Sequence, residues 1–215
     1  MKALIIADSP EFDLKLVERL AATSDFVVVT DGAVHKIGSR VTPNVVCGDF
    51  DSIDLDSARK GHPTAQFVAL PDQSKNDLEK ALLFLIERGA SEVAIACASG
   101  GRFDQAAANL AVIIRYQHLV PILMHQGSMV MTVLSPQGAA ARGISFRASK
   151  DSEISTIALE RAATVTLTNV KWPLSKGVLE PGSMGVSNRG LGGDVHVQAH
   201  DGVVLVFFES ERITQ

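Results

Sequence analysis

Short runs of apolar and β-branched residues alternate with longer amphipathic segments through the first 125 residues, and this rhythm limits the fold more than any other feature. The apolar runs cover residues 4–7, 26–30, 45–47, 66–70, 93–98 and 121–124. Their apolar residues stand at consecutive positions, which is typical of strands buried on both faces. The amphipathic segments cover residues 11–22, 55–61, 77–88 and 102–118. This alternation predicts an α/β domain over residues 1–125, with a mostly parallel sheet flanked by helices.

The pattern changes after residue 125. Strand-like runs follow at 129–134, 144–148, 163–167, 177–179, 195–199 and 203–209, separated by Gly, Pro, Ser and Asn. Several of these runs alternate apolar and polar residues, as half-buried strands do. We therefore expect residues 126–215 to form an all-β domain, either an antiparallel sandwich or an open barrel.

Charge and hydropathy exclude some functions. The 215 residues include 20 Lys and Arg against 24 Asp and Glu, a formal charge of −4, so no overall positive field favours a nucleic-acid partner. No window reaches the roughly 18 apolar residues that a membrane span needs, and the first apolar stretch ends at Asp8, too early for a signal peptide. We expect a cytoplasmic protein that binds any phosphate group locally or through a cation.

Carboxylates follow four predicted strands directly. Asp31 follows the second strand, Asp49 and Asp51 the third, Asp72 the fourth and Asp104 the fifth. Because the carboxyl ends of parallel strands form the ligand-binding edge of an open sheet, these side chains are expected at one edge.

Asp49 and Asp51 are candidate metal ligands. On an extended backbone both carboxylates would face the same way while Phe50 packs inward. Two such charges 4 Å apart repel by about 4 kcal/mol at an effective dielectric of 20, and ligands that are all oxygen favour Mg²⁺ over zinc. The alternative is that Asp51 caps the next helix and Asp49 closes an Asx turn.

Two further segments suit ligand binding. Gly100, Gly101 and Arg102 stand where a strand becomes a helix, so free N–H groups and a guanidinium could bind phosphate, although most Gly-Gly pairs are only turns. The chain has no Gly-x-x-x-x-Gly-Lys-Ser/Thr motif of the Walker type. In the second domain Trp172, which precedes Pro173, is either a ligand platform or a core or interface residue.

Four ordered motifs resemble those of thiamine pyrophosphokinases. They are Gly48-Asp49-Phe50-Asp51-Ser52-Ile53, Asp72-Gln73 with Asn76-Asp77-Leu78-Glu79-Lys80-Ala81-Leu82, Gly100-Gly101-Arg102-Phe103-Asp104-Gln105 with Asn109, and Lys171-Trp172-Pro173-Leu174 with Val186-Ser187-Asn188. The resemblance spans residues 30–188. It implies a Mg²⁺-dependent homodimer that transfers the pyrophosphoryl group of ATP to the hydroxyl of thiamine, giving thiamine diphosphate and AMP. It also implies an α/β nucleotide-binding domain followed by a β-sandwich that binds thiamine.

The resemblance and the strand-end positions together assign roles to residues. The catalytic aspartates are Asp49, Asp51, Asp72 and Asp77, of which the first three are expected metal ligands. The expected nucleotide-binding residues are Asp31, Lys75, Gly100, Gly101, Arg102, Asp104 and Asn109, and the expected thiamine-binding residues are Trp172, Ser187 and Asn188. Asp31, Asp72 and Asp77 are each candidates to accept the proton of the attacking hydroxyl.

The chain departs from the family at one motif. The family usually reads Asp-Gln-Asp-x-Thr-Asp where residues 72–77 read Asp-Gln-Ser-Lys-Asn-Asp. Ser74 therefore stands at the position of a metal-binding carboxylate of the family, and Asn76 at the position of a threonine. Either Asp72, Asp77 or a water molecule replaces the missing ligand, or the chain binds metal more weakly. Lys75 could instead reach a phosphate oxygen. The departure keeps two alternatives open: another small heterocyclic alcohol as substrate, or a non-catalytic protein that binds thiamine or nucleotide.

Overall fold

The computed structural model describes residues 1–51, 53–141 and 143–209. Ser52, part of one quoted motif, lies outside the described residues. The chain divides into two compact units, the first made of Met1–Val112 and Ile122–Gly127 and the second of Ile113–Pro121 and Ser128–Gln215.

A parallel sheet forms the centre of the first unit. Its strands run in the order β6-β5-β1-β2-β3-β4, and every pairing between them is parallel. The strands are β1 (Lys2–Ile6), β2 (Phe26–Thr30), β3 (Val45–Gly48), β4 (Gln66–Ala69), β5 (Glu92–Ala96) and β6 (Ile122–Gln126). The expected sheet is confirmed.

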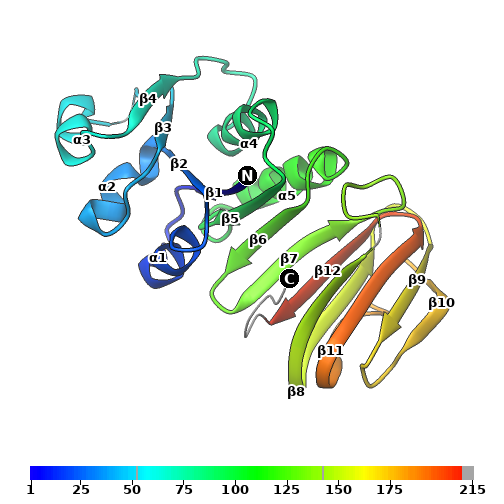
Figure 1. The fold of residues 1–215 in the computed structure, drawn as a ribbon. Coiled ribbons are helices and arrows are strands. Elements are labelled where there is room, and N and C mark those ends of the chain that lie inside the picture. The colour runs from blue at the N-terminus through cyan, green and yellow to red at the C-terminus, as the bar shows by residue number, and fades with distance from the viewer. Residues whose placement is uncertain (52, 142, 210–215) are drawn as a thin grey trace. The chain divides into compact units, whose positions relative to one another are not determined.

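Helices cover both faces of this sheet, which explains the apolar residues at consecutive positions. The helices are α1 (Leu14–Ala21), α2 (Val34–Ile37), α3 (Leu55–Gly61), α4 (Asp77–Glu87) and α5 (Phe103–Tyr116). Leu4 and Ile6 of β1 share a core with residues of α1, α2 and α3. The intervening Ile5 points to the opposite face, and Figure 1 shows α4 across the sheet from α1. The short α2 was not predicted, because four residues carry no helical periodicity.

The second unit is rich in antiparallel β structure, as expected, and it also includes the end of α5. Its strands run in the order β10-β9-β11-β8-β12-β7. They are β7 (Met129–Leu134), β8 (Ile144–Ala158), β9 (Ala163–Thr168), β10 (Leu174–Leu179), β11 (Asn188–Asp201) and β12 (Val204–Glu209). Strands β8 and β11 are much longer than predicted.

The long strand β8 bends, so that both of its halves contribute to one core. The rings of Phe146 and Phe208 stack with centroids 3.9 Å apart. Phe208 is the β12 partner of Ile154, yet Phe146 precedes Ile154 by eight residues, about 26 Å along a straight strand. Asp151, with φ of 66°, lies between them, where the pairing of β8 with β11 shifts register. The bend therefore lets the sheet fold over Phe146 and Phe208.

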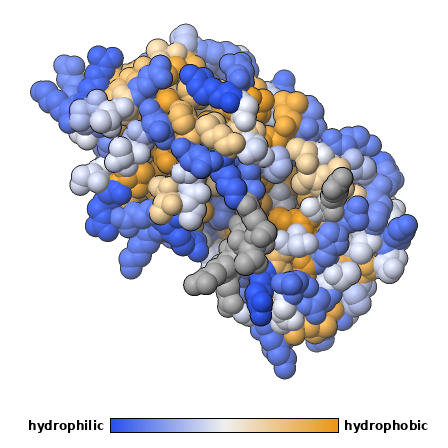
Figure 2. Space-filling model, viewed as in Figure 1, coloured by the Kyte–Doolittle hydropathy of each residue, from blue (hydrophilic) through white to orange (hydrophobic). Residues whose placement is uncertain are grey.

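No helix among the described residues is long and apolar enough to cross a membrane. The face in Figure 2 carries many hydrophilic side chains with hydrophobic patches between them.

Candidate active site

The topology of the first unit has a switch point between β1 and β5. The chain runs outward from β1 to β4 and then returns to β5 on the other side of β1, so the loops after β1 and β5 leave for opposite faces. In open α/β sheets, ligands bind at this switch point, outside the carboxyl ends of the strands.

Gly100 and Gly101 pack closely against the loop that follows β1. A Cβ on Gly100 would lie 2.8 Å from Cδ of Glu11, and one on Gly101 would lie 2.7 Å from Cγ of Pro10. Both glycines also have positive φ, 89° and 66°. These contacts require glycine without any ligand, so nucleotide binding by the pair stays a prediction.

Asp31 is the buried carboxylate of this edge. It follows β2, is 3% exposed, and accepts hydrogen bonds from the backbone N–H groups of Gly32 (2.8 Å) and Phe50 (2.9 Å). Burial raises the pKa of Asp31, and the nearby negative charges of Asp77 and Asp49 add to this effect while the two backbone donors oppose it.

The backbone at Phe50 is left-handed, with φ of 61°, so the extended conformation expected between Asp49 and Asp51 is wrong. The N–H of Phe50 bonds to Asp31, and its ring packs 6.1 Å from that of Phe67, so tertiary contacts hold this turn. Strained conformations of this kind concentrate at functional sites.

Asp49 accepts one hydrogen bond within the turn and one from outside it. The backbone N–H of Asp51 approaches Asp49 Oδ1 at 3.5 Å, as an Asx turn requires, and Nε2 of Gln73 donates to Asp49 Oδ2 at 3.0 Å. The Gln73 bond is the main reason that the pKa of Asp49 is lowered. The helix-capping alternative for Asp51 is wrong, because Asp54 caps α3 by accepting from the N–H of Ser57.

Lys80 is the charged residue that the sequence analysis did not assign to the site. It lies on α4, is 7% exposed, and its Nζ donates to Oδ1 of Asp77 at 3.1 Å. Its charge also contributes to the lowered pKa of Asp49, after the hydrogen bonds already described. A lysine is rarely buried without a partner, and here the charge of Lys80 lies near the carboxylates of Asp77 and Asp49. The sequence feature that could have indicated this burial is the position of Lys80 between Leu78 and Ala81, which are both buried.

Asp72 is bonded to its own neighbours. Its Oδ1 accepts from the N–H (2.9 Å) and Oγ (2.6 Å) of Ser74, and its Oδ2 forms an ion pair with Lys75. The Lys75 ammonium, together with Ser74, holds the pKa of Asp72 well below its usual range. Lys75 therefore stands where a cation was expected. Metal binding at Asp72, and phosphate binding by Lys75, stay predictions that require this pair to open.

Asn76 explains one of the two family departures. Its Oδ1 caps α4 by accepting from the N–H of Glu79 at 2.9 Å, and asparagine and threonine both serve as N-caps. Its Nδ2 donates to Oδ1 of Asn109 at 2.8 Å, and Nδ2 of Asn109 donates to the carbonyl of Ala98 at 2.7 Å. Asn109 therefore joins α5 to α4 and to the segment after β5, and its nucleotide contact stays a prediction.

Arg102 and Asp104 form a two-point ion pair with each other. Nε of Arg102 donates to Oδ1 at 3.0 Å and Nη2 donates to Oδ2 at 2.6 Å. This pair lowers the pKa of Asp104, and both side chains are largely exposed, at 74% and 64%. Phe103 between them is 88% exposed. The nucleotide role of the pair stays a prediction.

The aspartates thus divide into two groups. Asp31 interacts through space with Asp77 and Asp49, and Lys80 pairs with Asp77 and acts on Asp49, whereas Asp72 and Asp104 pair with their own cationic neighbours. Across residues 1–51, 53–141 and 143–209, no group of three or more His, Cys, Asp or Glu side chains is arranged to hold a metal ion. The expected set of Asp49, Asp51 and Asp72 is therefore not preassembled, because Lys75 and Ser74 bind Asp72.

In the second unit, Trp172 is 56% exposed, so it is not a core residue of that unit. Asn188, which is 6% exposed, bonds to the backbone of Trp172 in both directions: Oδ1 accepts from its N–H (3.1 Å), and Nδ2 donates to its carbonyl (2.8 Å). Ser187 is exposed, and its backbone N–H donates to Oγ of Ser155. Thiamine contacts by these residues stay predictions.

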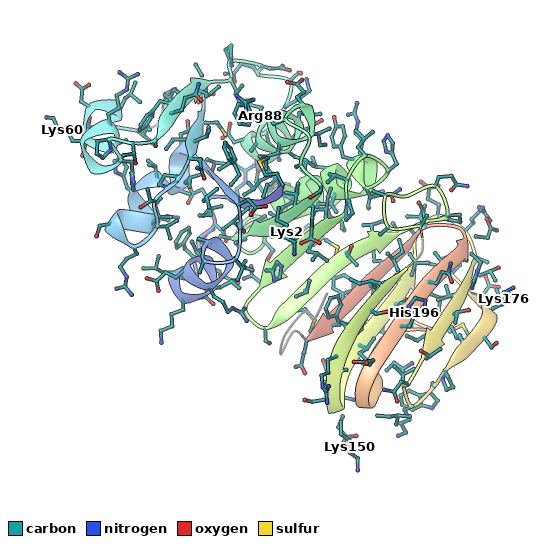
Figure 3. The ribbon with its side chains drawn as sticks, in the orientation of Figure 1. Lys2, Lys60, Arg88, Lys150, Lys176 and His196 are labelled. Atoms are coloured by element: carbon teal, nitrogen blue, oxygen red, sulfur yellow. The ribbon has the colours of Figure 1, made fainter. Side chains whose placement is uncertain are left out.

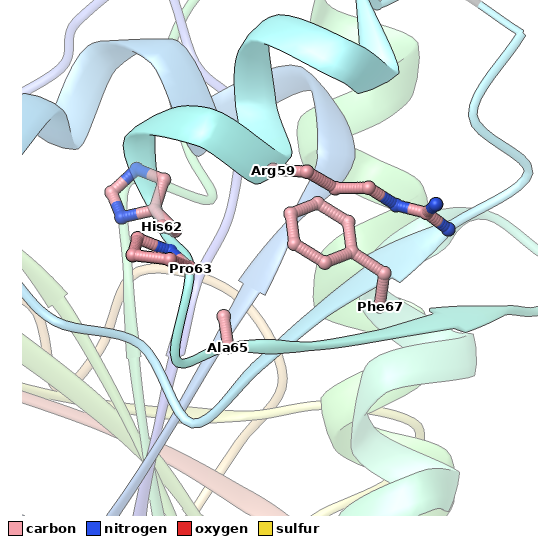
Figure 4. A pocket seen from close by; sticks show the side chains of 5 residues that line it. All are labelled: Arg59, His62, Pro63, Ala65 and Phe67. Carbon is pink, nitrogen blue, oxygen red and sulfur yellow. The ribbon is translucent and has the colours of Figure 1, made fainter.

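A cavity of about 300 Å³ lies between α3 and the start of β4. Its lining contains no carboxylate and consists of Arg59, His62, Pro63, Ala65 and Phe67. Figure 4 shows the side chain of Arg59 extended over the ring of Phe67, with the guanidinium 5.6 Å from the ring centre. The cavity adjoins the amino end of β4, whereas the acidic cluster follows the carboxyl ends of the strands.

The histidines take no part in the acidic cluster in the described structure. His196 lies on β11 of the second unit (Figure 3), with Nδ1 3.0 Å from Oγ of Ser145. His200 contacts Oγ1 of Thr166, and His118 contacts the carbonyl of Arg115.

Fold and site together define an α/β protein with acidic strand ends at a switch point, joined to an all-β unit that exposes a tryptophan. Residues 17–124 match the family model for the thiamin pyrophosphokinase catalytic domain, and residues 144–204 match that for the thiamin pyrophosphokinase vitamin B1 binding domain. The chain belongs to the thiamin pyrophosphokinase family.

Individual relatives agree with this assignment. Thiamin pyrophosphokinase 1 of Caenorhabditis elegans is 33% identical over 109 residues, which cover 46% of this chain and 44% of that protein. The match thus spans less than half of the relative's length. The solved thiamine pyrophosphokinase of Bacillus subtilis shares the fold with a TM-score of 0.79 at 19% identity, covering 99% of this chain and 100% of that one. The Candida albicans enzyme gives 0.75 at 15%, covering 97% and 89%.

Proposed function

We propose that this protein transfers the pyrophosphoryl group of ATP to the hydroxyl of thiamine, giving thiamine diphosphate and AMP. One observation carries the proposal: the catalytic and vitamin B1 binding family models match the chain in order, the first ending at residue 124 and the second beginning at residue 144. The cluster of Asp31, Asp49 and Asp77 at the carboxyl edge of the first sheet supplies the chemistry that such a transfer needs.

The donor set suits Mg²⁺. Mg²⁺ is usually bound by one or two carboxylates together with substrate phosphates, and Asp49 and Asp51 supply two carboxylates on one turn. Asp51 is exposed, and Asp49 is partly exposed. When bound, the ion would neutralise polyphosphate charge, which is the main requirement of phosphoryl-type transfer. Asp72 would join these ligands only after releasing Lys75.

Among the three candidate bases, the contacts favour Asp77. Asp31 is almost fully buried, and both of its oxygens accept backbone hydrogen bonds. Asp72 has a strongly lowered pKa, which makes it a weak base. Asp77 is 41% exposed, and Oδ1 bonds to Lys80. We therefore assign proton acceptance from the thiamine hydroxyl to Asp77.

On the nucleotide side, Arg102 is the residue best suited to bind phosphate. Its guanidinium is exposed, and its current partner Asp104 is also exposed, so exchanging one carboxylate for a phosphate costs little. Gly100 and Gly101 would offer backbone N–H groups to the polyphosphate near the switch point between β1 and β5.

We propose that the second unit is a β-sandwich that binds thiamine. The bend of β8 and the stacking of Phe146 on Phe208 support a sandwich. Trp172 would stack on the cationic heterocycle, which contributes roughly 0.5–2 kcal/mol. We also propose a homodimer, because large apolar side chains are exposed in the same part of the chain: Trp172 (56%), Met184 (62%), Val186 (43%) and Leu191 (55%). Light scattering would measure this assembly. A cytoplasmic location stays a prediction.

The deciding experiment incubates the protein with ATP, Mg²⁺ and thiamine. We expect AMP and thiamine diphosphate in equal amounts, and a loss of turnover with EDTA. ADP as product, or no turnover, would contradict the proposal. Parallel assays with other pyrimidine alcohols and with pteridine alcohols test the alternative substrate class, which a faster reaction than that of thiamine would favour.

A further inference from the structure

We infer that Asn188 is a positioning residue, which fixes the orientation of Trp172 through its backbone and makes no contact with the ligand itself. The inference rests on the proposed function, because it takes Trp172 as the platform for thiamine. It differs from the sequence expectation, which gave Asn188 a direct thiamine contact.

The side-chain amide of Asn188 forms its hydrogen bonds with backbone groups of the protein. Its Oδ1 accepts from the N–H groups of Trp172 (3.1 Å) and Arg189 (2.8 Å), and its Nδ2 donates to the carbonyl of Trp172 (2.8 Å). The side chain is therefore bonded to both backbone groups of one residue. With the residue only 6% exposed, little of the amide remains for a ligand.

Trp172 needs such a restraint because its own side chain is weakly packed. Trp172 is more than half exposed. It lies in the connection between β9 and β10, outside both strands. The Nζ of Lys171 lies 4.6 Å from the indole ring centre. Packing alone would leave the direction of the indole loosely determined, so the two bonds to the Trp172 backbone matter because they fix the direction in which its side chain leaves the chain.

Further hydrogen bonds hold the loop of residues 169–173, which carries Trp172, against β11. The N–H of Lys171 donates to the carbonyl of Arg189, and Val170 forms a bridge with Gly190. At the far end of this loop, Nδ2 of Asn169 donates to the carbonyls of Gly192 and Asp194. Asn169 and Asn188 are thus two asparagine clamps on one loop, and only Asn188 bonds to Trp172.

Trp172 is the single tryptophan of the chain, so its fluorescence reports this site alone. The test compares wild type with Asn188→Asp, which keeps the size and the acceptor but faces the Trp172 carbonyl with an oxygen in place of a donor. The matched control is Asn169→Gly, since glycine tolerates the φ of 58° at that position. Emission maximum and acrylamide quenching are measured without ligand, and then thiamine is titrated and steady-state rates are measured.

For Asn188→Asp we expect a changed emission maximum and stronger quenching without ligand. We also expect a thiamine dissociation constant raised about three- to tenfold, as loss of a hydrogen bond implies, and a kcat at saturating thiamine within about twofold of wild type. Asn169→Gly should leave the ligand-free fluorescence of Trp172 as in wild type. Should Asn188→Asp fail to fold, Asn188→Ala gives the same readouts without the repulsion between oxygens.

Weaker thiamine binding with unchanged ligand-free fluorescence would show a direct contact and overturn the inference, as would no change in either measurement. Failure of the proposed function is seen separately. In that case thiamine would alter neither the fluorescence nor the turnover of wild type, while the ligand-free comparison would still decide whether Asn188 orients Trp172.

Discussion

The carboxylate of Asp31 occupies the space that a side chain at residue 48 would need. A Cβ built on Gly48 would lie 2.2 Å from both Cγ and Oδ2 of Asp31. Gly48 ends β3, and Asp31 follows β2, the neighbouring strand. Because residue 48 is glycine, the buried carboxylate of Asp31, at the end of β2, can reach the N–H of Phe50, which follows β3. The turn that carries Asp49 and Asp51 depends on this contact.

Gly48→Ala should therefore destabilise the protein and reduce activity together. Asp31 is confined by its two backbone donors, so the added methyl must displace the carboxylate or the strand, at a cost of about 1–3 kcal/mol. Urea unfolding and the AMP assay measure the two effects. Gly61→Ala is the control, because nothing lies within 4 Å of its added Cβ, and we expect it to be neutral or stabilising by up to about 1 kcal/mol. Equal stability of the two variants would refute the steric argument.

Asp51→Asn should abolish most turnover while leaving the thermal melt nearly unchanged. The side chain is exposed and does not cap α3, so its charge contributes little to stability, whereas the proposed metal site loses one of two carboxylates. We expect the rate to fall about a hundredfold or more. Asp56→Asn, in the first turn of α3, removes a nearby exposed charge and should keep full activity. Full activity of Asp51→Asn would remove the metal assignment.

Much of the fold could be predicted because its signals are local. Most strands of the first sheet are runs of buried apolar residues, and α4 shows apolar residues at helical spacing. The expected burial is wrong for β4, which is the edge strand and is partly or fully exposed along its length. The full length of β8 could not be predicted. Its middle, residues 149–153, is polar and contains Asp151 with positive φ. Pairing with β11, distant in sequence, extends the strand through this segment.

The same division holds at the site. A general rule, that parallel strands end at a common edge, was enough to predict that Asp31 and Asp49 would lie close together. The rule says nothing of the turn at Phe50, because a bond to Asp31 determines that turn. Nor could local sequence show that Lys80 is buried on α4 with its charge near Asp49, which is distant from it in sequence. Side-chain pairing depends on tertiary distances, which periodicity does not encode.

His125 should make stability fall in mild acid. His125 lies near the end of β6 and is 4% exposed. Burial lowers its pKa from 6.5 to about 4, and the charge of Arg19 contributes a smaller part of this effect. Between these values the unfolded chain binds a proton that the folded chain does not. Stability is therefore complete above pH 6.5 and declines as the pH falls toward 4, by about 3 kcal/mol at most. Urea unfolding at pH 7 and pH 5 measures the decline.

His125→Met should flatten that pH dependence, since it removes the titrating ring from the interior. His35→Gln, on the exposed side of α2, should retain the wild-type decline. A decline that persists in His125→Met would assign the effect to another group.

Lys80→Met should make the protein more dependent on divalent cations. Without the ammonium, the carboxylates of Asp77 and Asp49 lose a nearby positive charge, and Mg²⁺ would then relieve a larger repulsion. An additional stabilisation of about 1 kcal/mol corresponds to roughly 2–4 °C in Tm for a chain of this size. We therefore expect Mg²⁺ to raise the Tm of Lys80→Met by that much more than it raises the Tm of wild type. Lys60→Met, at an exposed position of α3, should match wild type. If Mg²⁺ shifts all three proteins equally, Lys80 is not the internal counter-ion of these aspartates.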